Sequence, residues 1–273
     1  WDRPGFDDSS WRPVEVDAGV EAELVAQRNE PVRVLHELKP RSLHKLKNGA
    51  WLFDLGQNMV GRVRLRVRGK EGAVIRVRHA EMLAPDGGLY VANLRGAFPI
   101  DRYTLKGDPD GEVFEPRFTQ HGFRYVEVAG LEERPSVDDL TGRVFHSAAE
   151  QIGRFESSST LVNRIWESIL WTQRGNHVSV ITDCPQRDER LGWLGSLEPF
   201  AHTACYNMDV SALFLKVCRD FRLAQSEDGH FPNLAPNVLS FDKGAPAWAD
   251  AGISAPWTGY VHFANRRLLE ENY

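Results

Sequence analysis

The sequence predicts a multidomain chain in which an antiparallel β-sandwich precedes a group of helices. Between residues 31 and 156, apolar and polar residues alternate with a period of two, the spacing of strands with one buried face. From residue 157 onwards, apolar residues recur three and four positions apart, which is the helical spacing. Clusters of Gly, Pro, Asp and Asn interrupt the first region at short intervals, as the turns of a sandwich do.

The composition is that of an ordinary globular protein. The chain has 273 residues, of which 42% are hydrophobic and 26% are charged. These values exclude a disordered or collagen-like chain, and the length allows more than one domain with a sizeable core. The net charge of -5, without any basic tract, argues against a nucleic-acid partner. The sequence has no apolar run that could span a bilayer, so no membrane partner is expected.

The three cysteines form an odd and sparse set: Cys184, Cys205 and Cys218. Such a set argues against a disulfide scaffold and fits a reducing, cytoplasmic compartment better than an oxidising one. Because the sequence contains neither a CxxC nor an HExxH motif, a structural zinc site is not expected.

Residues 1–30 form a short, turn-rich segment that carries Trp1 and Trp11. The segment is too short to bury both indoles by itself. We interpret it as the tail of a preceding domain plus a connector, and the alternative is a local cap on the following sheet. The first residue is not Met and no charged-then-apolar leader follows it, which predicts either processing or a longer parent protein.

The β-sandwich is predicted over residues 31–156. Val63, Leu65 and Val67 alternate with arginines, which places the arginine row on the solvated face rather than in a basic binding stripe. Turns between strands are predicted at LGQN (residues 55–58), GKEG, PDGG and GDPDGE. The last two lack the ligand spacing of a calcium loop, so hairpin turns are expected there.

The helical region is predicted over residues 157–273. A serine run provides N-caps for a helix with a broad apolar face that ends near Gly175. A second helical pattern begins near Glu198, breaks near Asn207 and resumes through Phe221. Another helix is predicted over residues 257–263, and the loops between these helices are rich in Pro, Gly, Trp and Asp.

The stretch DCPQRDERLGW, residues 183–193, concentrates three acids and two arginines. Pro185 disfavours helical angles at Cys184, so the stretch should begin as a loop. Some of these charges should pair, and a carboxylate left in an apolar corner would have a raised pKa, as a general acid requires. The alternative is a salt-bridge cluster at the start of a helix, which the spacing alone favours.

These residues resemble a known family. DCPQRDERLGW, preceded by WTQRGNHVSVIT, is similar to the signature of the bacterial α-L-rhamnosidases. The resemblance implies an inverting glycoside hydrolase in which a β-sandwich is followed by an (α/α)6 barrel. It also implies that this chain is an internal fragment whose residues 157–273 form the first helices of an incomplete barrel. Further segments resemble the family's sandwich or barrel loops: FDLGQNMVGRVRLRVRG, RHAEML, YVANLRGA, FTQHGFRYVEV, FPNLAPN and PAWADAG.

The resemblance also implies roles for single residues. Glu189 matches the general acid, and no cofactor or metal is implied. The expected substrate is a terminal α-L-rhamnoside in a rhamnose-containing glycan or glycoside. Indole walls suit the apolar faces of a deoxysugar, and carboxylates accept hydrogen bonds from its hydroxyls. The implied substrate-binding residues are Asp183, Arg187, Asp188, Trp193 and Trp248, and Asp250, two residues after Trp248, is expected to bind a sugar hydroxyl.

Two features depart from the family pattern. Ser196 stands where the family has an aspartate, which predicts binding weaker by about 1–3 kcal/mol unless Glu198 substitutes. The family's general base is a glutamate in later helices, so we expect the base outside this chain and the isolated 1–273 piece to be inactive. The alternative function is a non-catalytic or altered-specificity glycan-binding relative on the same fold.

Overall fold

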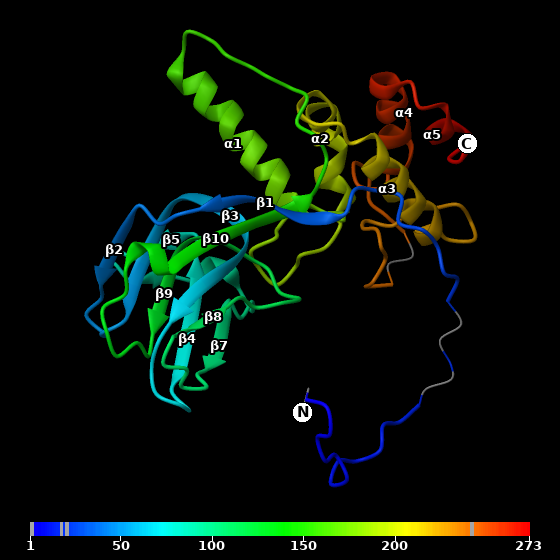
Figure 1. Ribbon diagram of the computed structural model, residues 1–273. Coiled ribbons are helices and arrows are strands. Elements are labelled where there is room, and N and C mark those ends of the chain that lie inside the picture. The colour runs from blue at the N-terminus through cyan, green and yellow to red at the C-terminus, as the bar shows by residue number, and fades with distance from the viewer. Residues whose placement is uncertain (1–2, 17–18, 20–21, 241–242) are drawn as a thin grey trace.

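The computed structural model describes residues 3–16, 19, 22–240 and 243–273. Figure 1 shows a sheet region, a long helix above it and a separate group of helices beside it. The described residues before position 32 contain no helix or strand and run as an extended trace into the first strand. Trp11 is 57% exposed and contacts the ring of Phe6, whereas Trp1 lies outside the described residues.

An antiparallel sheet occupies the first region, as predicted. Its hydrogen-bonded order is β1-β10-β3-β9-β4-β7, and β2 and β8 also pair with β3. The strands are β1 (Val32–Leu38), β2 (Ser42–Lys45), β3 (Trp51–Val67), β4 (Val74–Ala80), β7 (Ile100–Thr104), β8 (Glu112–Phe114), β9 (His121–Ala129) and β10 (Leu140–Ser147).

The prediction of a turn at LGQN is wrong, because residues 55–58 lie within the long strand β3. The pairing of β3 with β9 shifts register between Asp54 and Met59, where Gly56 has a φ of 71°. A bulge with glycine at positive φ bends a strand without ending it, and the sequence signal of such a bulge resembles that of a turn. The first half of β3 pairs with β9 and the second half with β10, so this strand joins the two parts of the sheet.

The predicted alternation along β3 is confirmed. Val63, Leu65 and Val67 are buried in a cluster with residues of β4, β9 and β10. The arginines that alternate with them point away from that core, and two of these are ion-paired: Arg62 Nε and Arg64 Nε donate to Glu115 at 2.8 and 2.9 Å. The arginine row is therefore an outward face that is partly neutralised.

Several short elements follow β4, and they lead to Arg95, which contacts the loop before α2 (Leu194–Asn207). β5 (Met82–Leu83) and β6 (Leu89–Tyr90) form a hairpin across the predicted PDGG turn. A 3-10 helix, η1 (Ala92–Leu94), comes next and leads into Arg95, which has a φ of 55°. Before β10 lies η2 (Val137–Asp139), and after α1 the strands β11 (His177–Val178) and β12 (Val180–Ile181) pair with each other.

The second region is helical: α1 (Thr160–Asn176), α2 (Leu194–Asn207), α3 (Ser211–Ala224), α4 (Ala251–Phe263) and α5 (Arg266–Glu270). The start and end of α1 agree with the prediction, and Ser159 is its N-cap. Two helices begin earlier than predicted. α2 begins at Leu194 rather than near Glu198, because Leu194 and Leu197 are buried in the helical core. α4 begins at Ala251 rather than at residue 257, because its first turns bury small residues. Both helices form despite the glycines and prolines that they contain.

The helices pack around their own core, made mainly by α2, α3 and α4. Two apolar faces lie outside it. Leu161 and Ile165 on α1 are exposed, and so are Ile253 and Trp257 on α4. Figure 1 shows the first half of α1 projecting away from the other elements. Among the described residues, no helix combines the length and apolar character that crossing a membrane would need.

Candidate functional site

The stretch at 183–193 lies between β12 and α2 and forms a loop, as predicted. It rests against the sheet: Gly122 in β9 is so close to Gln186 that a side chain at position 122 would collide with it. The stretch then passes directly into α2, with Trp193 at the N-cap position. The sheet and the helices therefore both position this loop.

Glu189 is held by two arginines. Its Oε2 accepts from Arg187 Nη2 at 2.6 Å, and its Oε1 accepts from Arg95 Nη1 at 2.9 Å. The Glu189 side chain is 26% exposed, so its carboxylate is still reachable from solvent. Arg187 was predicted at the site. The sequence did not indicate a role for Arg95, although this residue lies within YVANLRGA, which resembles a segment of the family.

The segment at Arg95 contacts a second acid of the loop. Asp188 is exposed, and its Oδ2 accepts from the backbone amide of Gly96 at 3.2 Å. One short piece of the sheet region thus binds two carboxylates of the loop. The salt-bridge cluster considered as an alternative is present, but it connects the sheet to the loop rather than starting a helix.

Asp183 is a half-buried acid of the loop, and burial affects its acidity. Burial raises the pKa of the Asp183 carboxyl; a hydrogen bond from Cys184 opposes this, and the negative charge of Glu189 adds to it. Its buried Oδ1 has no hydrogen-bond partner among the residues that the structure describes. The side chain also lines a groove of about 370 Å³ between β3 and α1, with Asn58, Trp171 and Gln186. An unsatisfied carboxylate oxygen beside a groove is suited to accept from a ligand hydroxyl.

Cys184 is a free, half-buried cysteine beside these acids. Burial raises the pKa of its thiol to about 11, and its sulfur accepts from Arg187 Nη2 at 2.8 Å. One donor atom each from Asp183, Cys184 and Glu189 lies within 4.8 Å of the others, a spacing that could hold a cation. The Arg187 guanidinium contacts two of these residues and already brings a positive charge to the cluster.

The two tryptophans lie near the first turn of α2. Trp193 precedes that turn, and its backbone bridges to Leu234. Trp248 is 41% exposed, and its indole lies against Gly195 in the turn itself. A Cβ at Gly195 would lie 2.5 Å from Trp248 Cε2, so only glycine leaves room for the ring. Ser196 follows in the same turn and is half-buried.

Asp250 is exposed, and its Oδ2 accepts from the backbone amide of Ala247 at 2.9 Å. Ala247 has a φ of 70°, so this bond stabilises a strained backbone position directly before Trp248. The structure therefore brings Asp183, Arg187 and Glu189 together, whereas the contact of Asp250 serves the loop that carries Trp248.

Both regions of the chain match domain families. Residues 44–146 match the bacterial alpha-L-rhamnosidase concanavalin-like domain, and residues 150–273 match the bacterial alpha-L-rhamnosidase 6 hairpin glycosidase domain. An α-L-rhamnosidase of Streptomyces avermitilis is 47% identical over 272 residues, which are 99% of this chain and 26% of that protein. One from Formosa agariphila is 37% identical and matches all of this chain with 30% of its own length.

Solved structures agree. The structure of the Streptomyces avermitilis α-L-rhamnosidase complexed with L-rhamnose superposes with a TM-score of 0.93, covering 98% of this chain and 26% of that one. An α-L-rhamnosidase from Dictyoglumus thermophilum, 38% identical, gives a TM-score of 0.94 over 99% of this chain and 31% of its own. The chain thus spans between a quarter and a third of its relatives, and over that span it belongs to the bacterial α-L-rhamnosidase family.

Proposed function

We propose that the protein hydrolyses terminal α-L-rhamnosides with inversion and that Glu189 is the general acid. The observation that carries the proposal is the position of the Glu189 carboxylate. It is partly exposed and lies in the loop that leads into α2, where Trp193 is the N-cap residue and the Trp248 indole packs against the first turn. We infer that the sugar packs on the indoles while this acid protonates the glycosidic oxygen.

Polar groups around this acid supply the contacts that a sugar needs. The unsatisfied Oδ1 of Asp183 would accept from one hydroxyl, and the exposed carboxylates of Asp188 and Asp250 would accept from others. Arg187 holds Glu189 in place and would donate to a ring substituent only by giving up a present contact. We assign Asp183 the principal binding role because its oxygen has no competing donor among the described residues.

Proton donation requires one oxygen of Glu189 to face the substrate. Both oxygens now accept from guanidinium groups. We propose that the Arg95 contact opens when the glycoside binds, because Arg95 is 56% exposed whereas Arg187 is 16% exposed and also bound to Cys184. The freed Oε1 then takes up a proton from solvent and donates it to the glycosidic oxygen, which occupies the place of the Arg95 nitrogen.

An inverting hydrolase also needs a carboxylate base about 6.5–9.5 Å from the acid, with a water between them. We propose that this base comes from outside residues 1–273, since this chain corresponds to only 26–30% of its curated relatives. We also propose that the helices here belong to an (α/α)6 barrel. The exposed apolar faces of α1 and α4 support this, because further helices packed there would bury them.

The test is Glu189→Gln in the full-length protein, assayed on two α-L-rhamnosides. Loss of a general acid should lower turnover by about 10²–10⁴-fold on a glycoside with a poor leaving group. The loss should be much smaller on a nitrophenyl rhamnoside, whose leaving group needs little protonation. Glu167→Gln, at an exposed carboxylate on α1, is the matched control and should retain activity. Equal turnover by Glu189→Gln and the parent on both substrates would place the acid elsewhere.

The alternative, a relative that binds glycan without cleaving it, is favoured by one observation. Ser196 occupies the turn beside Trp248 at the position where the family signature leads us to expect a carboxylate. If the full-length protein binds L-rhamnose and leaves both rhamnosides intact, this alternative replaces the first proposal.

A further inference from the structure

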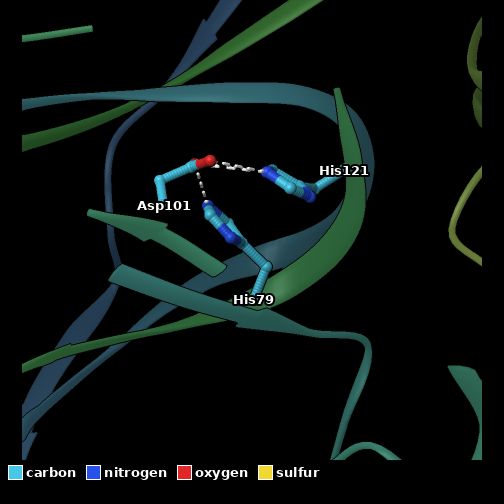
Figure 2. A group of neighbouring side chains, drawn as sticks. All are labelled: His79, Asp101 and His121. Atoms are coloured by element: carbon cyan, nitrogen blue, oxygen red, sulfur yellow. Dashed lines mark hydrogen bonds and ion pairs between the residues drawn. The ribbon is translucent and has the colours of Figure 1, made fainter. Parts of the chain in front are cut away.

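Three ionisable side chains meet inside the sheet, on elements separate from the loop that carries Glu189. They are His79 near the end of β4, Asp101 on β7 and His121 at the start of β9. The three strands are neighbours in the sheet. His79 is fully buried and His121 almost so, and the Asp101 side chain is only 12% exposed. Figure 2 shows both imidazoles pointing toward the Asp101 carboxylate.

The donor atoms of this cluster converge. Asp101 Oδ2 lies 3.1 Å from His121 Nε2 and 3.9 Å from His79 Nε2, and one donor atom from each residue lies within 4.8 Å of the others. Nitrogen and oxygen ligands bind a zinc-like ion at about 2.0–2.2 Å, so tetrahedral ligands lie roughly 3.3–3.6 Å apart. The two distances from Asp101 Oδ2 lie on either side of that spacing.

The hydrogen bond of His79 fixes which of its nitrogens carries the proton. Nδ1 lies 3.2 Å from the carbonyl oxygen of Pro99, and a carbonyl can only accept, so Nδ1 is the donor. With the proton on Nδ1, Nε2 of this fully buried ring is left as a bare lone pair. This lone pair faces the Asp101 carboxylate, another acceptor, and has no hydrogen-bond partner among the described residues.

Two buried acceptors that face each other without a proton between them are electrostatically unfavourable. A bound cation would resolve the conflict. The bond from His79 Nδ1 to a backbone carbonyl is also the outer contact that typically orients a metal-binding histidine. His121 can release its Nε2 to a metal by carrying its proton on Nδ1, which has no partner to lose among the described residues.

We propose that His79, Asp101 and His121 form a site for a divalent first-row transition ion, with Zn²⁺ the representative ion. Two imidazoles and one carboxylate suit such an ion, whereas Ca²⁺ and Mg²⁺ require oxygen ligands. The fourth position is filled by water. The ion ties together β4, β7 and β9. No local zinc motif marks this site, because each ligand comes from a different strand.

The experiment uses the full-length protein, treated with a chelator and then loaded with Zn²⁺ or Co²⁺. Metal content after gel filtration, the visible d–d bands of bound Co²⁺ and the melting temperature are measured. The parent should hold one more equivalent of metal than Asp101→Asn, which keeps the side-chain size but replaces the charged ligand. The variant should also lose the Co²⁺ bands of this site and bind Zn²⁺ at least tenfold more weakly.

His121→Gln provides a second variant, so that poor folding of one does not decide the outcome. His146→Gln, at a buried histidine on β10 outside the cluster, is the matched control and should keep the full metal content. The proposal is overturned if the parent takes up no Zn²⁺ or Co²⁺ after chelation, or if the Asp101→Asn protein shows the same stoichiometry and spectrum as the parent. None of these measurements depends on Glu189 or on rhamnoside cleavage.

Discussion

The Arg95 guanidinium donates to the Glu189 carboxylate across the boundary between the sheet and the helices, with Nη1 2.9 Å from Oε1. Arg95 follows η1 in the sheet region, whereas Glu189 lies in the loop before α2. The adjacent Gly96 amide binds Asp188 in the same loop. The sheet region therefore contributes directly to the site and does more than support the helices.

Arg95→Met should lower the KM for an unactivated rhamnoside by roughly 1.4–5-fold and leave kcat unchanged, because the glycoside no longer has to displace an exposed ion pair worth about 0.2–1 kcal/mol. Stability should change by less than about 1 kcal/mol, since an ion pair with an exposed arginine contributes little. Steady-state kinetics and denaturant unfolding of the full-length protein measure the two effects. Arg66→Met, at an exposed arginine on β3, is the control. An unchanged KM for Arg95→Met would show that this contact does not compete with the glycoside.

Ser196→Asp should strengthen binding of L-rhamnose. A restored charged hydrogen bond is worth about 1–3 kcal/mol, which is roughly 5–150-fold in affinity. The helix should tolerate the change, because the first turn of α2 has no acidic residue and its dipole favours one there. Calorimetry with L-rhamnose measures the effect, and Ser196→Asn separates charge from size. If affinity rises only when Glu198→Gln is also present, Glu198 already substitutes for the missing acid.

Gly195→Ala should weaken rhamnose binding without unfolding the protein. The added Cβ would lie 2.5 Å from Trp248 Cε2, so the indole must move. Alanine is the better helix former by about 1 kcal/mol, which offsets part of the resulting strain. Indole fluorescence should report the displaced ring, and rhamnose titration should report the lost affinity. Unaltered affinity together with a shifted fluorescence spectrum would mean that Trp248 does not contact the sugar.

The buried His177 should make the protein sensitive to acid. Burial lowers the pKa of His177 to about 3, below the value of about 6.5 expected in the unfolded chain. Between these values the unfolded state binds more protons, so stability falls as the pH falls, by about 1.4 kcal/mol per pH unit. His177→Phe should reduce this dependence, as measured by denaturant unfolding at pH 7.5, 6 and 5.

The matched control for that measurement is His44→Phe, at an exposed histidine on β2. Neither ring nitrogen of His177 has a hydrogen-bond partner among the described residues, so the apolar replacement should cost little stability at neutral pH. An acid dependence that is identical in the His177→Phe protein and the parent would contradict the assignment of a neutral, buried imidazole.

The sequence by itself determined the class and order of the elements. The alternation of Val63, Leu65 and Val67 identified a one-sided strand, and the serine run before residue 160 identified the start of α1. Pro185 marked the loop that carries the acids. These features depend on neighbours within a few residues, and side-chain periodicity and capping report such neighbours directly. The signature at 183–193 identified the family for the same reason, because its residues are contiguous.

Only the tertiary structure decided which distant residues meet. The Arg95–Glu189 pair, the fit of Trp248 on Gly195 and the His79–Asp101–His121 cluster each join segments far apart in the chain. The same holds for LGQN, where pairing with β9 continues a strand through residues that have the composition of a turn. No local period encodes such contacts, because they depend on how the sheet and helices pack against one another.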